Sequence, residues 1–441
     1  MDADELYEQF RASYDDSEKF DLAMQIAREC EYGSVGGYSE AEWYAQAYNL
    51  TYDQDEQLEL AKMIARICEN DGSRVDGYDY GEWYAKAYEL TRDSDEQRDF
   101  AEKIAEACGR YDRIDGYDAG EWLARAFNLT WDTDDKYELA IKIAKTCEAN
   151  DSRADGLDFG EWYAEAYDLC RDSDRQSILA ETIAESCGDY NNVRGLNAAE
   201  WLARAYETSR DDGKRLELAK RIANSLDSYD KVDGCGAGDW YARAFNSTWD
   251  DDEKYKLALK IAQACKNSGS DVEYMGYGEW YAKAYYLCRD YDDRSELAEI
   301  VADACDSYNG IDGCSAAEWL GRAYDLSNDR DKQYGLAVQI ADSLDRYDRV
   351  DGCDAGEWLA RAFNLAWDSD DQCRLALRLA DICESENTTV DGYGLGDWLG
   401  KAYDVSGYYD QADIAARIAR YCEEYDERVN GYNAEYWNEQ S

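Results

Sequence analysis

Carboxylates are the side chains that this chain offers for chemistry. Its 441 residues include 99 Asp plus Glu, 47 Lys plus Arg and no His, and the net charge is -52. Because His is the commonest general base and metal ligand, its absence excludes Ser-His-Asp, Cys-His and His-metal sites. A pair of carboxylates can hydrolyse a glycosidic bond, but nothing in the sequence singles out two of the 99 acids. We therefore expect no catalytic residue and a protein that is not an enzyme.

Short Asp-x-Asp segments are the best candidates for a metal site. Carboxylate oxygens ligate Ca²⁺, but no copy continues with the Gly and Glu that complete an EF-hand loop. An Asp placed before a helix also accepts hydrogen bonds from the first free amides, and we favour this role over metal binding. We expect no cofactor. The remaining candidates for Ca²⁺ are Asp93, Asp95, Asp132, Asp134, Asp250 and Asp252.

The 15 cysteines do not form a disulfide framework. Their number is odd, and nine of them recur at one position of a repeated pattern, where Leu226 and Leu344 replace two further copies. Interchange with Leu indicates a small buried apolar side chain rather than a reactive thiol. The other six lie outside this position and are expected to be more exposed: Cys170, Cys235, Cys288, Cys314, Cys353 and Cys373.

The carboxylates and thiols are set in a repeat of 39 or 40 residues, and each copy is marked by a tryptophan. A fixed period of this length is typical of repeat arrays, in which each unit buries its apolar side against the next. The sequence predicts an all-α fold, an α-α solenoid or superhelix of about eleven antiparallel helix hairpins. The tryptophans are Trp43, Trp83, Trp122, Trp162, Trp201, Trp240, Trp280, Trp319, Trp358, Trp398 and Trp437.

The repeat divides the chain into three predicted segments. Residues 1–36 form a degenerate N-terminal hairpin, in which Leu6 stands near the place of the tryptophan. Residues 37–429 form ten tandem helix-turn-helix repeats, and residues 430–441 form a truncated C-terminal half-repeat.

A capping box marks the first helix of each repeat. In one copy Asp118 lies four residues before Trp122, and Glu121 follows three residues after the Asp. The Asp side chain accepts the N3 amide while the Glu side chain reaches back to the N-cap amide. The residues at +1, +2, +4, +5 and +7 from Trp are apolar in most copies, a stripe wider than one helix face requires. We infer that the helix is covered on several sides, with Trp filling the gap between repeats.

The second helix follows the pattern Leu-Ala-x-x-Ile-Ala-x-x-Cys, as in Leu139 to Cys147, which forms one apolar stripe. The return loop to the next repeat ends in an apolar residue followed by Asp and Gly, as in Ile114 to Gly116. The Asp-Gly pair favours a tight turn with positive φ. We expect the apolar residue before it to hold the loop against the core.

The first helix also carries a regular pair of charges. An acid precedes Trp and a Lys or Arg follows four residues after that acid in most copies, which is the order that stabilises a helix. We expect these residues to pair and to form a line of alternating charge that a protein partner could bind. The candidates are Glu82, Lys86, Glu121, Arg125, Glu200, Arg204, Glu318, Arg322, Glu357 and Arg361.

A longer period of 118 residues overlies the repeat from about residue 118. Trp131, Trp249 and Trp367 recur at this interval as additional tryptophans after the first helix. Tandem duplication of a three-repeat block explains the period. The functional alternative is a feature presented once every third repeat, such as a contact with a partner or a lateral assembly contact.

The motif Trp-Tyr-Ala-Lys-Ala-Tyr, at Trp83 to Tyr88 and again at Trp280 to Tyr285, lies in a helix-turn-helix unit. This unit resembles the Sel1-like and tetratricopeptide repeat class, and the resemblance covers nearly the whole chain. It implies a scaffold that holds peptides or partner domains on a concave surface, without identifying the ligand.

The net charge favours a basic protein partner and disfavours nucleic acid and anionic lipid. Our main interpretation is a non-enzymatic acidic scaffold that binds a basic protein segment. A second is end-to-end assembly of copies into a filament or ring through Tyr436 and Trp437 in the terminal half-repeat. A third is a nucleic-acid mimic. Without a signal peptide or an apolar run of membrane-spanning length, we expect a cytoplasmic protein that does not bind membranes.

Overall fold

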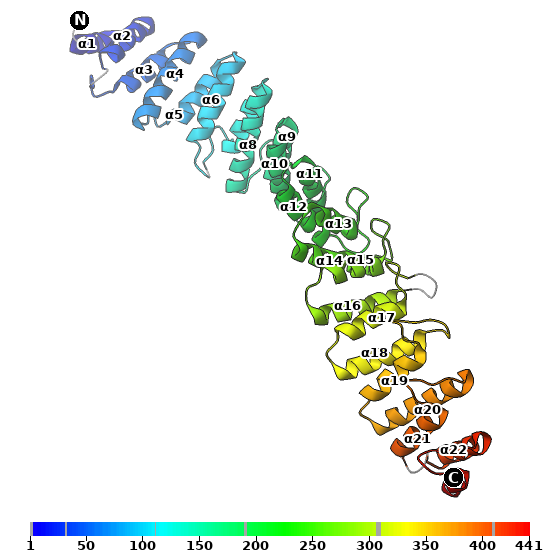
Figure 1. Ribbon diagram of the computed structural model, residues 1–441. Helices are drawn as coiled ribbons and strands as arrows, with labels where there is room; N and C mark the ends of the chain where they lie inside the picture. The colour runs from blue at the N-terminus through cyan, green and yellow to red at the C-terminus, as the bar shows by residue number, and fades with distance from the viewer. Residues whose placement is uncertain (1–2, 31–32, 111, 189–191, 306–309, 408–410) are drawn as a thin grey trace. The chain divides into compact units, whose positions relative to one another are not determined.

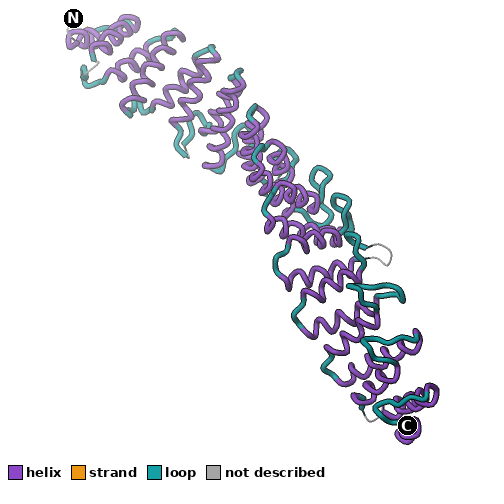
Figure 2. Tube along the Cα trace, in the orientation of Figure 1, coloured by secondary structure: helices purple, strands orange, loops and turns teal. Residues whose placement is uncertain are grey.

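The computed structural model describes residues 3–30, 33–110, 112–188, 192–305, 310–407 and 411–441. It divides into two compact units, residues 1–214 and 215–441. The described residues form 23 α-helices and no strand (Figure 2). Helices α1–α11 belong to the first unit and α13–α23 to the second, and the boundary falls inside α12 (Figure 1).

The first helix of each complete repeat has the same length throughout the chain. Each of these ten helices has 11 residues. They are α3 (Glu40–Leu50), α5 (Tyr80–Leu90), α7 (Ala119–Leu129), α9 (Phe159–Leu169), α11 (Ala198–Thr208), α13 (Ala237–Ser247), α15 (Tyr277–Leu287), α17 (Ala316–Leu326), α19 (Ala355–Leu365) and α21 (Leu395–Val405).

The second helices vary in length. Four have 18 residues: α4 (Gln54–Asp71), α8 (Thr133–Asn150), α14 (Asp251–Ser268) and α20 (Ser369–Glu386). The others have 14 or 15 residues: α2 (Asp16–Glu29), α6 (Ser94–Ala107), α10 (Ser173–Ser186), α12 (Asp212–Ser225), α16 (Tyr291–Ala304), α18 (Arg330–Ser343) and α22 (Gln411–Tyr425). The long helices occur in the repeats whose tryptophans are 40 residues apart, so the extra residue of the period accompanies an extra helical turn.

Capping boxes start the first helices as the sequence predicts. The amide of Glu121 donates to Asp118 Oδ1 and the amide of Asp118 donates to Glu121 Oε2, each at 2.9 Å. At Gly236, which has no side chain, the return bond from its amide to Asp239 Oδ2 remains at 2.9 Å. Each N-cap bond satisfies a backbone donor that the helix itself leaves unpaired.

Aromatic rings form the contacts between successive repeats. Each repeat tryptophan is at most 2% exposed, and within each unit the aromatic residue five positions after one tryptophan meets the next one edge to face. Tyr285 and Trp319 have ring centroids 5.1 Å apart, and Tyr324 and Trp358 have centroids 5.0 Å apart. This arrangement is the favoured geometry for aromatic pairs. The tryptophan therefore fills the space between repeats, as predicted.

The apolar stripes of the second helices complete the core. Leu139, Ala140, Ile143, Ala144 and Cys147 of α8 are all buried. Each helix contacts the one before and the one after it, from α1 to α11 and from α13 to α23. The α-α solenoid class predicted from the period is confirmed. None of the described helices is long and apolar enough to cross a bilayer.

The first and last tryptophans of the repeat are both buried. At the N-terminus, α1 (Ala3–Ala12) buries Leu6 and places Phe10 edge to face with Trp43, with centroids 5.0 Å apart. At the C-terminus, α23 (Ala434–Gln440) contacts α22 and buries Trp437.

Replacing a core tryptophan should destabilise the fold far more than replacing an exposed one. Trp319 is fully buried and its Nε1 donates to the carbonyl oxygen of Ile311 at 3.0 Å, whereas Trp249 is 92% exposed. We expect Trp319→Ala to lower the free energy of unfolding by about 3–5 kcal/mol. Trp249→Ala should change it by less than about 0.5 kcal/mol. Urea unfolding followed by far-ultraviolet circular dichroism measures both; equal losses would contradict this account of the core.

Candidate interaction surface

Return loops fix the start of each first helix beside a buried indole. Ile114 and Tyr117 form an isolated antiparallel bridge around Asp115 and Gly116, whose φ angles are 51° and 85°. Nε1 of Trp122 donates to the carbonyl oxygen of Ile114 at 3.1 Å. The tryptophan, the loop and the helix cap are thus held as one unit. The same bond, at 3.0–3.3 Å, forms at Trp43, Trp83, Trp162, Trp201, Trp280, Trp319, Trp358, Trp398 and Trp437.

Eight cations three residues after tryptophan, which we call the cation row, lie over aromatic rings. The guanidinium carbon of Arg125 is 3.8 Å from the ring centroid of Tyr117 and 5.0 Å from that of Trp122. A cation at such a distance is attracted by the negative face of the ring. The cation row consists of Lys86, Arg125, Arg204, Arg243, Lys283, Arg322, Arg361 and Lys401.

The ion pairs predicted along the first helix are not present. No ion pair joins Glu82 to Lys86, Glu121 to Arg125 or the other three predicted pairs, all of which lie in the described residues. The acids are used as caps: Glu82 Oε2 accepts the amide of Asp79 at 2.9 Å. The capping bond draws the carboxylate toward the helix start while the cation lies on the rings. The same capping bond is made by Glu121, Glu200, Glu318 and Glu357.

Ion pairs connect the second helices of neighbouring repeats instead. Lys62 Nζ is 2.6 Å from Glu96 Oε1, and Lys220 Nζ is 2.8 Å from Glu253 Oε1. Burial would lower the pKa of Lys62, but its hydrogen bonds to Glu96 and Glu59 outweigh burial and raise it. These pairs were not predicted from the sequence. Residues of opposite charge separated by slightly less than one repeat length, on successive second helices, could have indicated them. Further pairs are Lys103–Glu69, Lys142–Glu106, Lys214–Glu181, Lys332–Glu299, Arg378–Asp342 and Arg417–Asp381.

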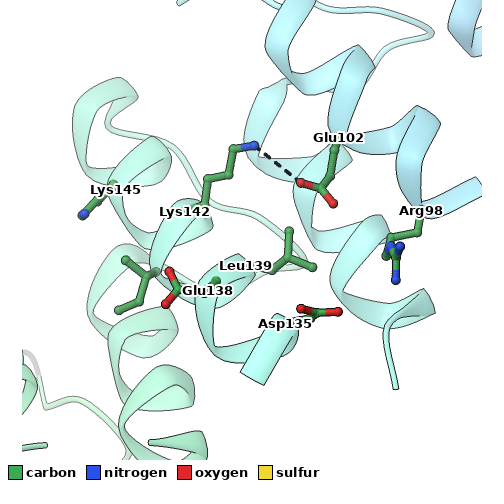
Figure 3. A pocket seen from close by; sticks show the side chains of 8 residues that line it. Arg98, Glu102, Asp135, Glu138, Leu139, Lys142 and Lys145 are labelled. Carbon is green, nitrogen blue, oxygen red and sulfur yellow. Dashed lines mark ion pairs between the residues drawn. The ribbon is translucent and has the colours of Figure 1, made fainter. Parts of the chain in front are cut away.

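An open hollow of about 460 Å³ lies between α6 and α8 on this second-helix face (Figure 3). Lys142 points across it toward Glu102, with Nζ 3.6 Å from Oε2 (Figure 3). Arg98, Lys142 and Lys145 face an equal number of acids, Glu102, Asp135 and Glu138. The charges of the lining cancel, so the hollow has no net field that would select a charged ligand.

Three of the calcium candidates are N-caps of second helices, and the other three, Asp95, Asp134 and Asp252, lie in the first turn of the same helices. Asp93, Asp132 and Asp250 each accept two backbone amides through the side chain. For Asp250 these are the amides of Asp252 and Glu253, at 2.8 and 3.1 Å. Within the described parts of the chain, no group of three or more His, Cys, Asp or Glu is arranged to hold a metal ion.

Exposed aromatic side chains lie at four of the turns between the two helices of a repeat, one before each 18-residue second helix. Tyr52, Trp131, Trp249 and Trp367 are 90%, 91%, 92% and 72% exposed. The sequence revealed three of them as a recurring position but gave no indication of their exposure. Residues 52–57, 131–136, 249–254 and 367–372, which these aromatics begin, are called the aromatic–acidic turns below.

Three cysteines outside the repeated position are buried, contrary to the prediction. Cys170 and Cys288 occupy the C-cap of a first helix, where other copies place a buried Thr or Ser. Cys373 takes the place of the buried Ser177, which hydrogen-bonds the next repeat through the carbonyl oxygen of Ala205. The prediction took positions outside the repeated one to be more exposed, whereas these three are buried as well.

The other three outlying cysteines are half-buried. Cys235, Cys314 and Cys353 take the place of the loop tyrosine beside the cation row. Nη2 of Arg322 lies 3.0 Å from Sγ of Cys314, and Nη2 of Arg361 lies 3.0 Å from Sγ of Cys353. The arginine side chains of the cation row therefore partly cover these thiols.

Trp437, one of the two predicted self-assembly residues, is covered by its own chain. It is 2% exposed, and its ring meets Tyr403 edge to face with centroids 4.8 Å apart. Tyr436 is half-buried and stacks on Tyr432 at 3.9 Å. Docking of another copy on Trp437 would require these contacts to open, and self-assembly stays a prediction.

Comparison with known proteins identifies no family for the chain. No protein-family model matches it, and no curated protein sequence matches it. Solved structures that align with it include the apo form of the quorum sensor NprR from B. thuringiensis, at 12% identity and TM-score 0.22, covering 83% of this chain and 97% of that one. Yeast Tom70 aligns at 13% identity and TM-score 0.22, covering 96% and 95%.

A monomeric mutant of IFIT1 with Gppp-AAAA aligns at 12% identity and TM-score 0.16, covering 96% of this chain and 82% of that one. Because these TM-scores are low, the class of protein is defined by the chain's own helices and the contacts between them. The chain is a helical-repeat protein built of α-α hairpins.

Alkaline pH should destabilise the fold through its buried thiols. Burial raises the pKa of Cys147 from 9.0 to about 11, so the unfolded chain loses this proton first as the pH rises. The contribution of the buried, protonated thiol to the free energy of unfolding is complete below pH 9 and is lost between about pH 9 and 11. Between pH 8 and 11, the free energy of unfolding of Cys147→Ala should therefore fall by about 2 kcal/mol less than that of the wild type. Urea unfolding at both pH values measures the difference, and identical pH dependence would contradict the burial of this thiol.

Proposed function

We propose that this chain is an acidic helical-repeat scaffold that binds a basic segment of a protein partner and is not an enzyme. The observation that carries the proposal is the unequal use of the two charges. Cations of the cation row lie on aromatic rings, and the second-helix cations named above contact carboxylates of neighbouring repeats. Even if every cation were paired with one acid, 52 carboxylates would be in excess.

Excess charge of one sign attracts a partner of the opposite sign over distances longer than a contact. In this chain part of the excess lies at the turns between the two helices of a repeat. Asp134, Asp252 and Asp370 are exposed there, beside the N-cap of a second helix. A basic segment that approached these turns would neutralise exposed carboxylates. At Asp252 it would compete with Arg289 of the next repeat, whose Nη1 lies 3.8 Å from Asp252 Oδ1.

The Sel1-like or tetratricopeptide character of the repeat belongs to the same proposal. The buried tryptophans and the repeated hairpins leave long, regular edges of turns on which an extended segment could lie. A cytoplasmic location, where many basic segments are accessible, is part of the proposal as well. The predicted binding residues Lys86, Arg125, Arg204, Arg322 and Arg361 belong to the cation row. Because these cations lie on aromatic rings, the carboxylates of the turns are the groups that meet the basic segment.

Neutralising acids at the turns should weaken binding more than neutralising the same number of acids elsewhere. The probe is a fluorescein-labelled peptide of five Lys-Gly-Ser units, measured by fluorescence anisotropy. We expect affinity to fall at least about tenfold between 50 and 300 mM NaCl because salt screens the attraction. At 50 mM salt, the triple variant Asp134→Asn, Asp252→Asn and Asp370→Asn should bind about fivefold more weakly than the wild type.

The control variant is Asp115→Asn, Asp233→Asn and Asp351→Asn. It removes the same charge at the same 118-residue spacing, but from the return loops at the opposite end of the first helix. Asn tolerates the positive φ of these positions, so the fold should be retained. Equal weakening by the two variants would show that only net charge matters, and binding indifferent to salt would refute the proposal.

A further inference from the structure

The aromatic–acidic turns differ from the other turns in both aromatic content and charge. Net charge is -3 for residues 52–57, -2 for 131–136, -3 for 249–254 and -3 for 367–372. The turns before the shorter helices α6, α10, α12, α16 and α18 begin instead with Arg92, Arg171, Arg210, Arg289 and Asn328, and their net charge lies between -2 and +1. Each turn with an exposed aromatic ring is thus acidic, and three of the four carry more negative charge than any turn that begins with Arg or Asn.

Tandem duplication does not by itself account for the exposed rings. Trp131, Trp249 and Trp367 follow the 118-residue period, but Tyr52 lies 79 residues before Trp131 and is outside it. No packing role within the repeat explains them either, because each ring is more than two-thirds exposed. A large aromatic ring on the surface, surrounded by charge of one sign, is typical of a binding anchor.

Trp367 shows which group such a ring binds. The guanidinium carbon of Arg330 lies 3.6 Å from the centroid of its indole. Nε and Nη2 of Arg330 donate to the carbonyl oxygens of Leu365 and Asn364, at 2.9 and 3.0 Å. The arginine therefore caps the last carbonyls of α19 and stacks on the exposed indole at the same time.

The equivalent place at Trp131 has no arginine. Arg330 is the first residue of α18 and lies 37 positions before Trp367; the residue 37 positions before Trp131 is Ser94, the first residue of α6. Ser94 is exposed, and its short side chain cannot cover an indole. In the described residues no cation lies over the ring of Trp131, whereas Trp249 has Lys254 of its own turn at 5.4 Å.

We propose that the aromatic–acidic turns are arginine-binding sites for the partner. This inference rests on the proposed binding of a basic segment and adds its chemistry. An arginine of the partner stacks on the indole of Trp131 or Trp249 and donates to the last carbonyls of the preceding first helix, as Arg330 does at Trp367. The Asp residues of the turn neutralise its charge. Arginine is preferred over lysine because its planar guanidinium can stack and donate several hydrogen bonds together.

The first test removes the rings. Two fluorescein-labelled peptides of equal charge, five Arg-Gly-Ser units and five Lys-Gly-Ser units, are compared by fluorescence anisotropy. The wild type should bind the arginine peptide about fivefold more tightly. The triple variant Trp131→Ala, Trp249→Ala and Trp367→Ala keeps only the ring of Tyr52 and should lose most of this preference. Because these rings are exposed, far-ultraviolet circular dichroism should show an unchanged fold.

The matched control replaces three exposed rings in the return loops, by Tyr229→Ala, Tyr274→Ala and Tyr347→Ala. These side chains are 84%, 102% and 87% exposed, and the control should keep the arginine preference. An unchanged preference in the tryptophan variant would overturn the inference. It would leave the proposed function standing if binding still weakened with salt, whereas absence of binding to both peptides would overturn both.

The second test supplies the missing arginine from within the chain. Ser94→Arg should place a guanidinium over Trp131 and lower affinity for the arginine peptide about twofold, and Arg330→Ser should raise it by uncovering Trp367. Ser173→Arg is the charge-matched control, since Ser173 begins α10 and the turn 37 residues later starts with Arg210 rather than an aromatic residue. Equal effects of Ser94→Arg and Ser173→Arg would contradict a site at Trp131.

Discussion

The structure depends on one interaction, the placement of a buried indole between two repeats. The indole N–H of Trp358 donates to the carbonyl oxygen of Val350 in its own return loop at 3.2 Å, while its ring meets Tyr324 of the preceding repeat. The hydrogen bond fixes the loop and therefore the capping box that starts the helix. The ring contact requires a neighbouring repeat, so a single hairpin would leave its tryptophan exposed to water.

The distribution of charge follows from this core. Cations beside the indoles are drawn onto the rings, and the capping boxes use the acids that would otherwise have paired with them. The remaining cations of the second helices connect neighbouring repeats. Each such surface pair contributes at most about 1 kcal/mol to stability. The ion pairs therefore add to the stability of the contact between repeats, whose main source is the buried core. The unused acids and the exposed rings of the aromatic–acidic turns are left for a partner.

The sequence predicted the helix hairpins well because each hairpin is specified by local patterns, which recur along the chain. The spacing of Trp, the capping boxes and the Leu-Ala-x-x-Ile-Ala stripe each act within one hairpin, and all appear as predicted. The site was predicted less well because it depends on contacts between repeats. The sequence showed where Lys86 lies in the repeat. It did not show that the Nζ atom of Lys86 would lie 4.3 Å from the ring centroid of Tyr78. Likewise Cys170 was expected to be exposed, although the fold buries it. The periods of 40 rather than 39 residues coincide with the longer second helices, although the lengths of these helices were not predicted from the sequence.

The most direct test of this account is a double-mutant cycle across one contact between repeats. Tyr324→Ala, Trp358→Ala and the double variant would be compared by urea unfolding. Tyr324 and Trp358 belong to consecutive repeats and have ring centroids 5.0 Å apart. If the indole joins the repeats, the double variant should lose at least about 1 kcal/mol less than the sum of the single losses. Losses that add within about 0.3 kcal/mol would show that the two repeats are stabilised independently, which contradicts the central claim.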